Sequence, residues 1–303
     1  MASKTQGSAA DLASQAGERV AIDRILFATD FSAVSSNAVS YAKALAHRFS
    51  SSVEIAHVFD PAPVGSHEEA MKGLPVKERR RLVEDDLKRI KEDFSASGID
   101  VQTILPEGHR ASVSLLKIVK EQKMDLIVAG TRSKSGMERL LLGSTAEQLV
   151  RNAACPVFTV GPHAKQPPPL FFERIVYATD FLLEAARAAV YALLFAEDSG
   201  AHLYVCHVLV PQERRTKMHD LPESAFHSAL KQMIPDSSYD WCNPECVVEH
   251  GEATNAILEF ATRVHADLIV LGAHKDWSWL TPADRGIVPG VWSRSTCPIL
   301  TAC

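Results

Sequence analysis

The amino-acid sequence predicts a mixed α/β protein made of two tandem doubly wound domains. Its 303 residues are enough for about two domains of the usual 100–200 residues. The second half of the chain repeats the first, and short apolar runs alternate with helical segments in each half. Together these observations indicate a duplicated domain in which parallel strands alternate with helices.

The duplication rests on four matched blocks that keep the same order in both halves. They are RILFATDFS (24–32) with RIVYATDFL (174–182), EIAHVF (54–59) with YVCHVL (204–209), DLIVAG (125–130) with DLIVLG (267–272), and ACPVFTV (154–160) with TCPILTA (296–302). We therefore expect a flexible N-terminal tail over 1–22, a first domain over 23–162, a Pro-rich linker over 163–172 and a second domain over 173–303.

The strands and helices of the first domain follow from its apolar pattern. Five short runs rich in Val and Ile predict strands buried on both faces of a parallel sheet, at 25–29, 53–59, 101–105, 126–130 and 156–160. Helices are predicted between them, at 37–49, 77–94 and 112–122. In 77–94 the residues Val83, Leu87, Ile90 and Phe94 recur at helical spacing, opposite a solvated face of mixed charges. Right-handed crossovers then give each copy a Rossmann-like sheet of about five parallel strands flanked by helices.

Charge and composition exclude several classes of protein. The net charge of -5 argues against a nucleic-acid partner, because phosphate backbones are bound by clustered Lys and Arg. No apolar stretch is long enough to span a membrane, and the first twenty residues lack the apolar core of a signal peptide. Six sparse cysteines do not suggest a disulfide framework, so we expect a cytoplasmic protein.

A ligand of such a fold binds beyond the carboxyl ends of the strands. This places attention on Asp30, on Val58 and on the segment that starts at Gly130. That segment reaches Gly143-Ser144, and Ser144 with Glu147 has the spacing of a helix capping box. A helix that opens there offers backbone N–H groups to a phosphate, although a tight turn with a good cap and no ligand explains the same residues.

These residues resemble the universal stress protein family in its tandem form, from Arg24 to Ala302. The ATP-binding branch of that family carries a signature of Gly, two residues, Gly, nine residues, Gly, then Ser or Thr. Gly130, Gly143 and Ser144 match it, and Ser133 stands where the second glycine is usual. If that position needs positive φ, Ser133 is strained there. If it needs only closeness to phosphate, Ser133 adds a hydroxyl donor.

The resemblance implies a stress-response protein that binds ATP in its first domain, with Mg²⁺ or Mn²⁺ on the phosphates. Asp30 would contact the adenosine end, and Val58 and Ala129 would line the adenine pocket. The full set of implied binding residues is Ala28, Asp30, Val58, Ala129, Gly130, Ser133, Gly143, Ser144 and Thr145, the last five around ribose and phosphates.

The second copy keeps Asp180, Val208 and Gly272, but its loop differs. Aligned without gaps, Lys275, Arg285 and Gly286 replace Ser133, Gly143 and Ser144, and Pro282 and Pro289 constrain the segment. We expect the phosphate cradle to be lost there. Three tryptophans fall in the same stretch, Trp277, Trp279 and Trp292. They are core residues or, alternatively, a surface through which a nucleotide-free scaffold binds a protein partner.

No catalytic residues are predicted. The sequence has no GxxxxGK, HExxH or G-x-S-x-G motif, so slow ATP hydrolysis remains a weaker alternative to binding alone. Cys242, Cys246 and His250 lack an evident fourth ligand, so we do not expect a zinc site. His57 and His207 are expected to be structural. The last strands, 156–160 and 298–302, are expected to pair antiparallel within the chain as an intramolecular pseudo-dimer, and a homodimer stays open.

Overall fold

The computed structural model describes residues 20–62, 73–131, 144–165, 172–210, 221–273 and 287–302. These residues divide into two compact units. The first unit contains the first copy together with 287–302, and the second unit contains 172–273. The end of the chain therefore groups with the first copy. The domain bounds expected from the sequence stay a prediction.

The first unit is a sheet whose first five strands are parallel. Its elements are β1 (Arg24–Ala28), α2 (Ala33–Phe49), β2 (Ser52–Ala56), α3 (Val76–Ala96), β3 (Val101–Ile104), α4 (Ala111–Gln122), β4 (Leu126–Gly130), α5 (Ser144–Asn152), β5 (Val157–Val160), α9 (Ile287–Trp292) and β10 (Ile299–Ala302). The strand order is β3-β2-β1-β4-β5-β10. This is the doubly wound α/β fold that the sequence predicts, with the order reversing between β1 and β4.

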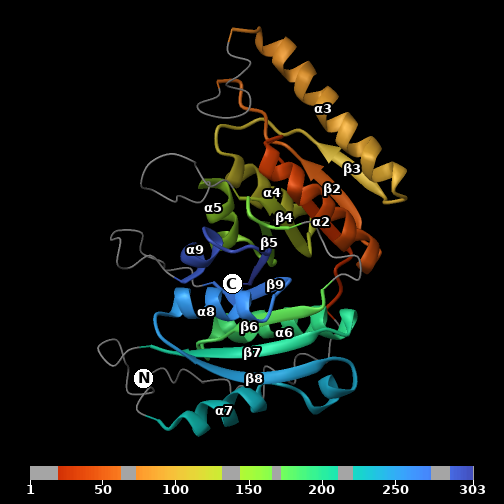
Figure 1. Cartoon of the computed structure of the whole chain (residues 1–303). Helices are drawn as coiled ribbons and strands as arrows, with labels where there is room; N and C mark the ends of the chain where they lie inside the picture. Colours follow the sequence, from red (N-terminus) through yellow and green to blue (C-terminus); the bar gives the residue numbers. More distant parts are fainter. Residues whose placement is uncertain are drawn as a thin grey trace, which may run out of the picture. The chain divides into compact units, whose positions relative to one another are not determined.

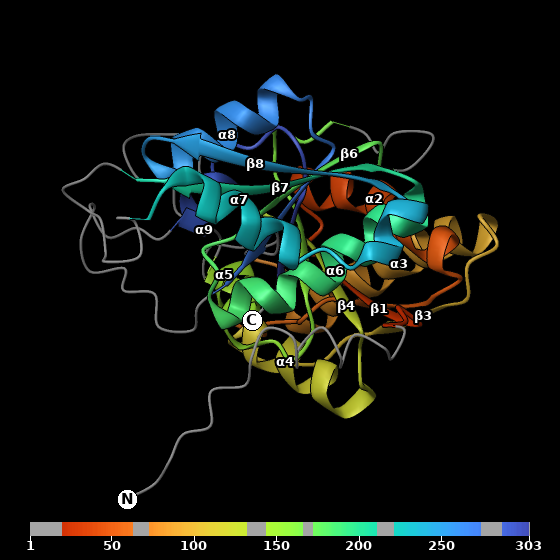
Figure 2. The ribbon, with the colours of Figure 1, turned by 90° about the horizontal axis from the view of Figure 1, so that it is seen from below.

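The helices cover the two faces of this sheet. Figures 1 and 2 show α2 and α3 against one face and α4 and α5 against the other, as right-handed crossovers require. The apolar stripe of α3 is buried at Val83, Leu87 and Phe94, and the Phe94 ring packs 5.9 Å from that of Phe27 on β1. Ile90 of the same stripe is only half-buried.

The second unit repeats the arrangement with four parallel strands. Its elements are β6 (Arg174–Ala178), α6 (Leu183–Ser199), β7 (His202–Leu209), α7 (Glu223–Gln232), the 3₁₀ helix η4 (Asp236–Asp240), β8 (Asn243–His250), α8 (Ala253–Arg263) and β9 (Leu268–Gly272). The strand order is β9-β6-β7-β8. Ala178 lies beside Cys206 on β7 and Leu271 on β9, which matches the register of the first unit.

The last strand of each copy forms an antiparallel pair, as predicted. β5 and β10 pair with Phe158 opposite Leu300. The pair is fixed further by two buried hydroxyls. Thr159 Oγ1 donates to Ile299 O at 3.0 Å, and Thr301 Oγ1 donates to Val157 O at 3.3 Å. Each strand thereby protects the sheet edge of the other from outside pairing.

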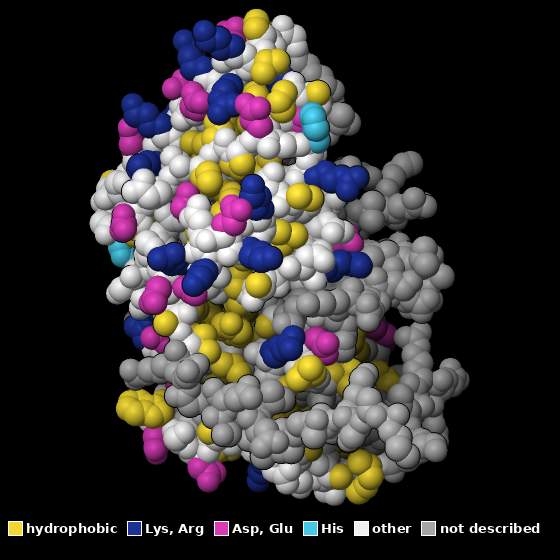
Figure 3. Space-filling view, turned by 180° about the vertical axis from the view of Figure 1, so that it is seen from behind, with side chains coloured by type: hydrophobic (Ala, Val, Ile, Leu, Met, Phe, Trp, Pro, Cys, Tyr) yellow, Lys and Arg dark blue, Asp and Glu magenta, His cyan; other side chains and the backbone are white. Residues whose placement is uncertain are grey.

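The described surface carries charges of both signs. Figure 3 shows Lys and Arg side chains interspersed with Asp and Glu on one face of the molecule. On α3 the opposite charges lie one turn apart, as in Arg80 with Glu84 at 3.1 Å and Lys88 with Glu92 at 3.9 Å. Among the residues described, no helix has both the length and the apolar character needed to cross a membrane.

Candidate functional site

Three neighbouring strands of the first unit end at one edge. Ala28, the last residue of β1, lies beside Ala56 of β2 on one side and Ala129 of β4 on the other. Asp30 and Val58 follow two residues later, and Gly130 closes β4. The structure thus brings together five of the predicted residues, Ala28, Asp30, Val58, Ala129 and Gly130. Ser133 and Gly143 lie outside the described residues.

The turn from β1 into α2 is fixed by side chains rather than by backbone bonds alone. Asp30 Oδ1 accepts hydrogen bonds from Ser32 N at 3.0 Å, Ser32 Oγ at 2.5 Å and Ser35 Oγ at 3.1 Å. Ser32 is the N-cap of α2, and its hydroxyl accepts from Ser35 N. The carboxylate of Asp30 therefore holds the first turn of the helix in place, whatever else it contacts.

The turn also stores backbone strain. Phe31 has a φ of 56°, which is uncommon for a bulky residue. Its N–H donates to Thr29 Oγ1 at 3.0 Å, and its ring lies 4.5 Å from the His57 ring. Sequence reasoning did not single out Thr29, Ser32 or Ser35. The sequence did contain a signal for the start of α2, because Ser32 is a good capping residue placed just before an apolar helix.

The two strand-end histidines are structural, as predicted. His57 Nδ1 lies 2.9 Å from Thr29 O, and His207 Nδ1 lies 2.8 Å from Thr179 O. A backbone carbonyl can only accept, so each Nδ1 carries the proton in this bond. Both imidazoles are buried, which ties the end of the second strand to the end of the first in each copy.

Gly130 is required by packing. A Cβ at this position would lie 2.8 Å from both Cα and N of Ser35, in the first turns of α2. The matching Gly272 is tighter, with its Cβ placed 2.4 Å from Ala185 N. In both copies, therefore, the end of the fourth strand touches the backbone of the first helix. This close approach is sufficient reason for the glycine even without a ligand.

The helix that follows the loop, α5, begins at Ser144. This places Ser144 and Thr145 in the first turn, where backbone N–H groups have no intrahelical acceptor. The carboxylate of Glu147, the acidic residue of the predicted capping box, forms an ion pair with Arg151 at 3.2 Å. Partial burial raises the pKa of Glu147, and the neighbouring Arg151 opposes that rise.

The second unit repeats the turn without the helix cap. Asp180 Oδ1 accepts from Leu182 N at 3.0 Å, and Phe181 has a φ of 64°. Leu182 replaces Ser32, so α6 has no side-chain cap. Val208 is buried there. Because this turn occurs in both copies, it belongs to the fold, and what distinguishes the first copy is the Ser32 cap and the sequence that follows Gly130.

Several second-copy predictions fall outside the described residues, namely Lys275, Trp277, Trp279, Pro282, Arg285 and Gly286. Trp292, the last residue of α9, is 3% exposed and belongs to the core. Pro289 lies in the first turn of α9, where proline is tolerated. The partner-binding role proposed for the tryptophans therefore keeps only Trp277 and Trp279 as candidates.

No described group of three His, Cys, Asp or Glu residues is arranged to hold a metal ion. The zinc candidates have other neighbours. Cys242 Sγ lies 3.3 Å from Ser238 O, and His250 Nε2 lies 3.5 Å from the carboxylate of Glu223. Burial raises the pKa of Cys242 to about 11.

Comparisons with known proteins agree with this architecture. The universal stress protein family model matches twice, at residues 21–161 and 171–300. A universal stress protein of Methanocaldococcus jannaschii is 36% identical over 138 residues, which is 45% of this chain and 81% of that protein.

Solved structures show the same fold over nearly the whole chain. A universal stress protein from Archaeoglobus fulgidus aligns with a TM-score of 0.73 at 20% identity, over 93% of this chain and 98% of its own. A functionally unknown Pseudomonas aeruginosa protein aligns with a TM-score of 0.62 at 17% identity, over 93% and 92%. The chain belongs to the universal stress protein family and carries two of its domains in tandem.

Proposed function

We propose that the first copy binds an adenine nucleotide, ATP, at the strand-end edge, and that the protein acts in stress response by binding rather than by catalysis. The observation that carries this proposal is the meeting of Asp30, Val58 and Gly130 at one edge, with the N-terminus of α5 following in sequence. A carboxylate, an apolar side chain and helix N–H groups suit ribose, adenine and phosphate respectively.

The phosphate end depends on backbone donors. The first turn of α5 offers N–H groups at Ser144 and Thr145, and the helix dipole adds positive potential there. Mg²⁺ or Mn²⁺ would accompany the phosphates and offset their charge. The matching helix of the second copy, α9, begins at Ile287, and Pro289 in its first turn supplies no N–H. We therefore propose one nucleotide for each chain.

Absence of turnover is part of the proposal. Hydrolysis needs a group that orients water at the terminal phosphate. Asp30 fixes α2, and His57 Nδ1 is bonded to Thr29 O, so each of these side chains has a structural role in the turn. A purified sample that releases phosphate from ATP at a rate abolished by a site variant would contradict this part.

The sharpest test of the phosphate end uses Ser144. Proline is favoured at the first position of a helix, so Ser144→Pro removes one N–H while α5 is retained. Ser144→Ala keeps the N–H and removes only the hydroxyl. We expect Ser144→Pro to weaken ATP about tenfold, the effect of losing one charge-assisted hydrogen bond, and to leave adenosine affinity unchanged.

Titration calorimetry on the full chain with ATP and adenosine measures both affinities. If Ser144→Pro and Ser144→Ala behave alike toward ATP, the backbone of α5 does not contact the phosphates. If ATP does not bind the unmodified chain, the proposed function fails.

A further inference from the structure

A pocket of about 210 Å³ opens beside the β1–α2 turn, between α2 and α3. We call it the α2/α3 pocket. It is lined by Thr29, Phe31, Ser36, Val39, Asp86, Arg89 and Ile90. None of these residues is in the set implied for nucleotide binding. Thr29 and Phe31 flank Asp30 in the chain, and Thr29 Oγ1 donates at 3.2 Å to Ser35 Oγ, the hydroxyl that donates to Asp30.

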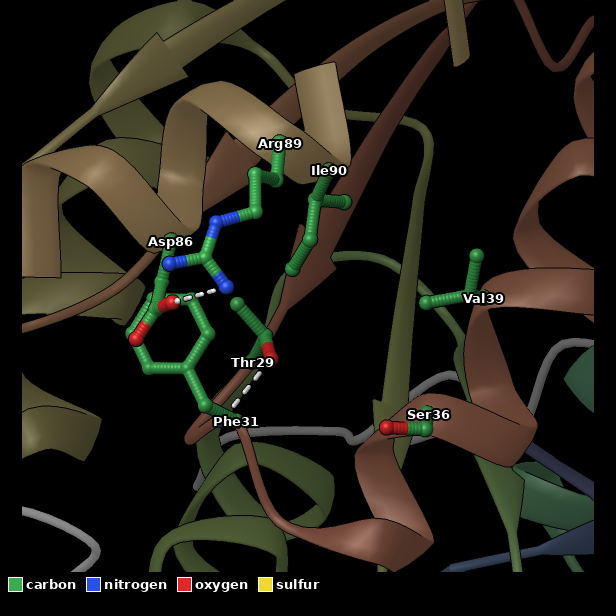
Figure 4. A pocket seen from close by; sticks show the side chains of 7 residues that line it. All are labelled: Thr29, Phe31, Ser36, Val39, Asp86, Arg89 and Ile90. Atoms are coloured by element: carbon green, nitrogen blue, oxygen red, sulfur yellow. Dashed lines mark hydrogen bonds and ion pairs between the residues drawn. The ribbon is translucent and has the colours of Figure 1, made fainter. Parts of the chain in front are cut away.

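The pocket combines an apolar interior with two opposite charges. Figure 4 shows Val39 on α2 across an open space from Ile90 on α3, with Thr29 and Phe31 at the end of β1. Arg89 Nη1 lies 3.2 Å from Asp86 Oδ1, and the two side chains are 73% and 23% exposed. The carboxylate is therefore the inner charge and the guanidinium the outer one, and both belong to the lining.

In the second unit an aromatic ring packs beside Phe181, the counterpart of Phe31. Phe226 of α7 is 2% exposed, lies 6.2 Å from the Phe181 ring and stacks on His207 at 5.0 Å. In the first unit the helix after β2 presents Asp86, Arg89 and Ile90 toward the equivalent Phe31. Ile90 is half-buried on a helix face that is otherwise buried, because its side chain borders this pocket.

We propose that the α2/α3 pocket binds a small zwitterion, an α-amino acid with an apolar side chain. The ammonium group pairs with Asp86, the carboxylate pairs with Arg89, and the side chain lies between Val39 and Ile90. A ligand with only a carboxylate would place a negative charge beside Asp86. A ligand with only an ammonium group would place a positive charge beside Arg89. A zwitterion satisfies both members of the ion pair.

Three probes with one carbon skeleton test the charge requirement. They are L-leucine, 4-methylpentanoate, which lacks the amino group, and 3-methylbutylamine, which lacks the carboxylate. Binding to the full chain is measured by calorimetry and by ligand-observed NMR, with and without ATP. We expect one equivalent of leucine to bind, and each analogue to bind at least about fivefold more weakly, because each loses one charged contact.

Variants locate the binding. Arg89→Gln is expected to lower leucine affinity about fivefold but not to weaken 3-methylbutylamine, because it removes a like charge from the path of the ammonium group. Asp86→Asn is likewise expected to lower leucine affinity about fivefold but not to weaken 4-methylpentanoate. Arg81→Gln, an exposed change on the same helix, is the matched control. Val39→Phe fills the space and should abolish leucine binding without changing ATP affinity.

The proposal is overturned if leucine binds no better than its analogues, or if Arg89→Gln and Arg81→Gln give the same affinity. It is also overturned if leucine does not bind the chain at all. None of these results bears on the nucleotide site, because ATP affinity is measured on the same samples.

Discussion

The close approach of β4 to α2 predicts that Gly130→Ala damages the first copy. The added Cβ would lie 2.8 Å from Cα and N of Ser35 and 3.0 Å from the carbonyl carbon of Val34. All three atoms are helix backbone, so α2 must shift to accommodate the methyl group. Overpacking of this kind costs about 1–3 kcal/mol. ATP affinity should fall as well, because the displaced turn carries Asp30.

Gly108→Ala is the matched control. Its Cβ would lie 2.8 Å from Ser114 Oγ, the end of a side chain that can rotate away, and 3.7 Å from a methyl carbon of Val58. Neither Gly108 nor Gly130 has positive φ, so loss of glycine freedom is similar in the two variants. We expect Gly108→Ala to cost less than about 1 kcal/mol.

Hydrogen exchange over peptides from Ala33–Phe49 measures the stability of α2 directly, which avoids treating a two-unit chain as a single transition. Gly130→Ala should speed exchange in these peptides, and Gly108→Ala should leave it nearly unchanged. Equal exchange in both variants would show that the strand end does not press on α2 and would refute the packing explanation of Gly130.

Three further predictions follow from caps and buried thiols. Ser32→Ala removes the N-cap of α2 and should lower the unfolding free energy by about 1 kcal/mol, seen as a lower Tm of the first unit. Leu182→Ser supplies the missing cap of α6 and should raise the Tm of the second unit, because Leu182 is exposed and loses little packing. Burial raises the pKa of Cys155 and Cys206 from 9.0 to about 12, so the folded chain keeps these thiols protonated above pH 9 while the unfolded chain does not. Stability should therefore fall as pH rises from 9 toward 12, and Cys206→Ala should lessen the fall in urea titrations at pH 8 and pH 10.5.

Much of the fold could be predicted because each strand is a short Val- and Ile-rich run and the whole set occurs twice. The run at 53–59 shows the limit of that pattern. β2 ends at Ala56, although His57 N still donates to Ile104 O and Phe59 still bridges to Glu107, whereas the matching strand β7 continues to Leu209. The apolar pattern continues past the strand, and only the hydrogen bonds reveal where the strand ends.

The candidate site was predictable at the strand ends and less so around them. Asp30, Val58 and Gly130 could be placed because parallel strands end at one edge. The second role of Asp30, as the acceptor that fixes Ser32 and Ser35, depends on side-chain geometry that spacing alone does not give. The α2/α3 pocket was missed for the same reason. Ile90 matched the buried face of a helix, and its spacing does not show that it borders an opening.

The most direct test of nucleotide binding is the identity and amount of nucleotide released by acid from freshly purified chain, determined by mass spectrometry. We predict ATP or ADP near one equivalent for each chain, lost when Gly143 is replaced by a bulky residue. Two equivalents would show that the second copy also binds, contrary to the single site proposed for the first copy. A chain that releases no nucleotide and does not take up added ATP would contradict nucleotide binding by the first copy.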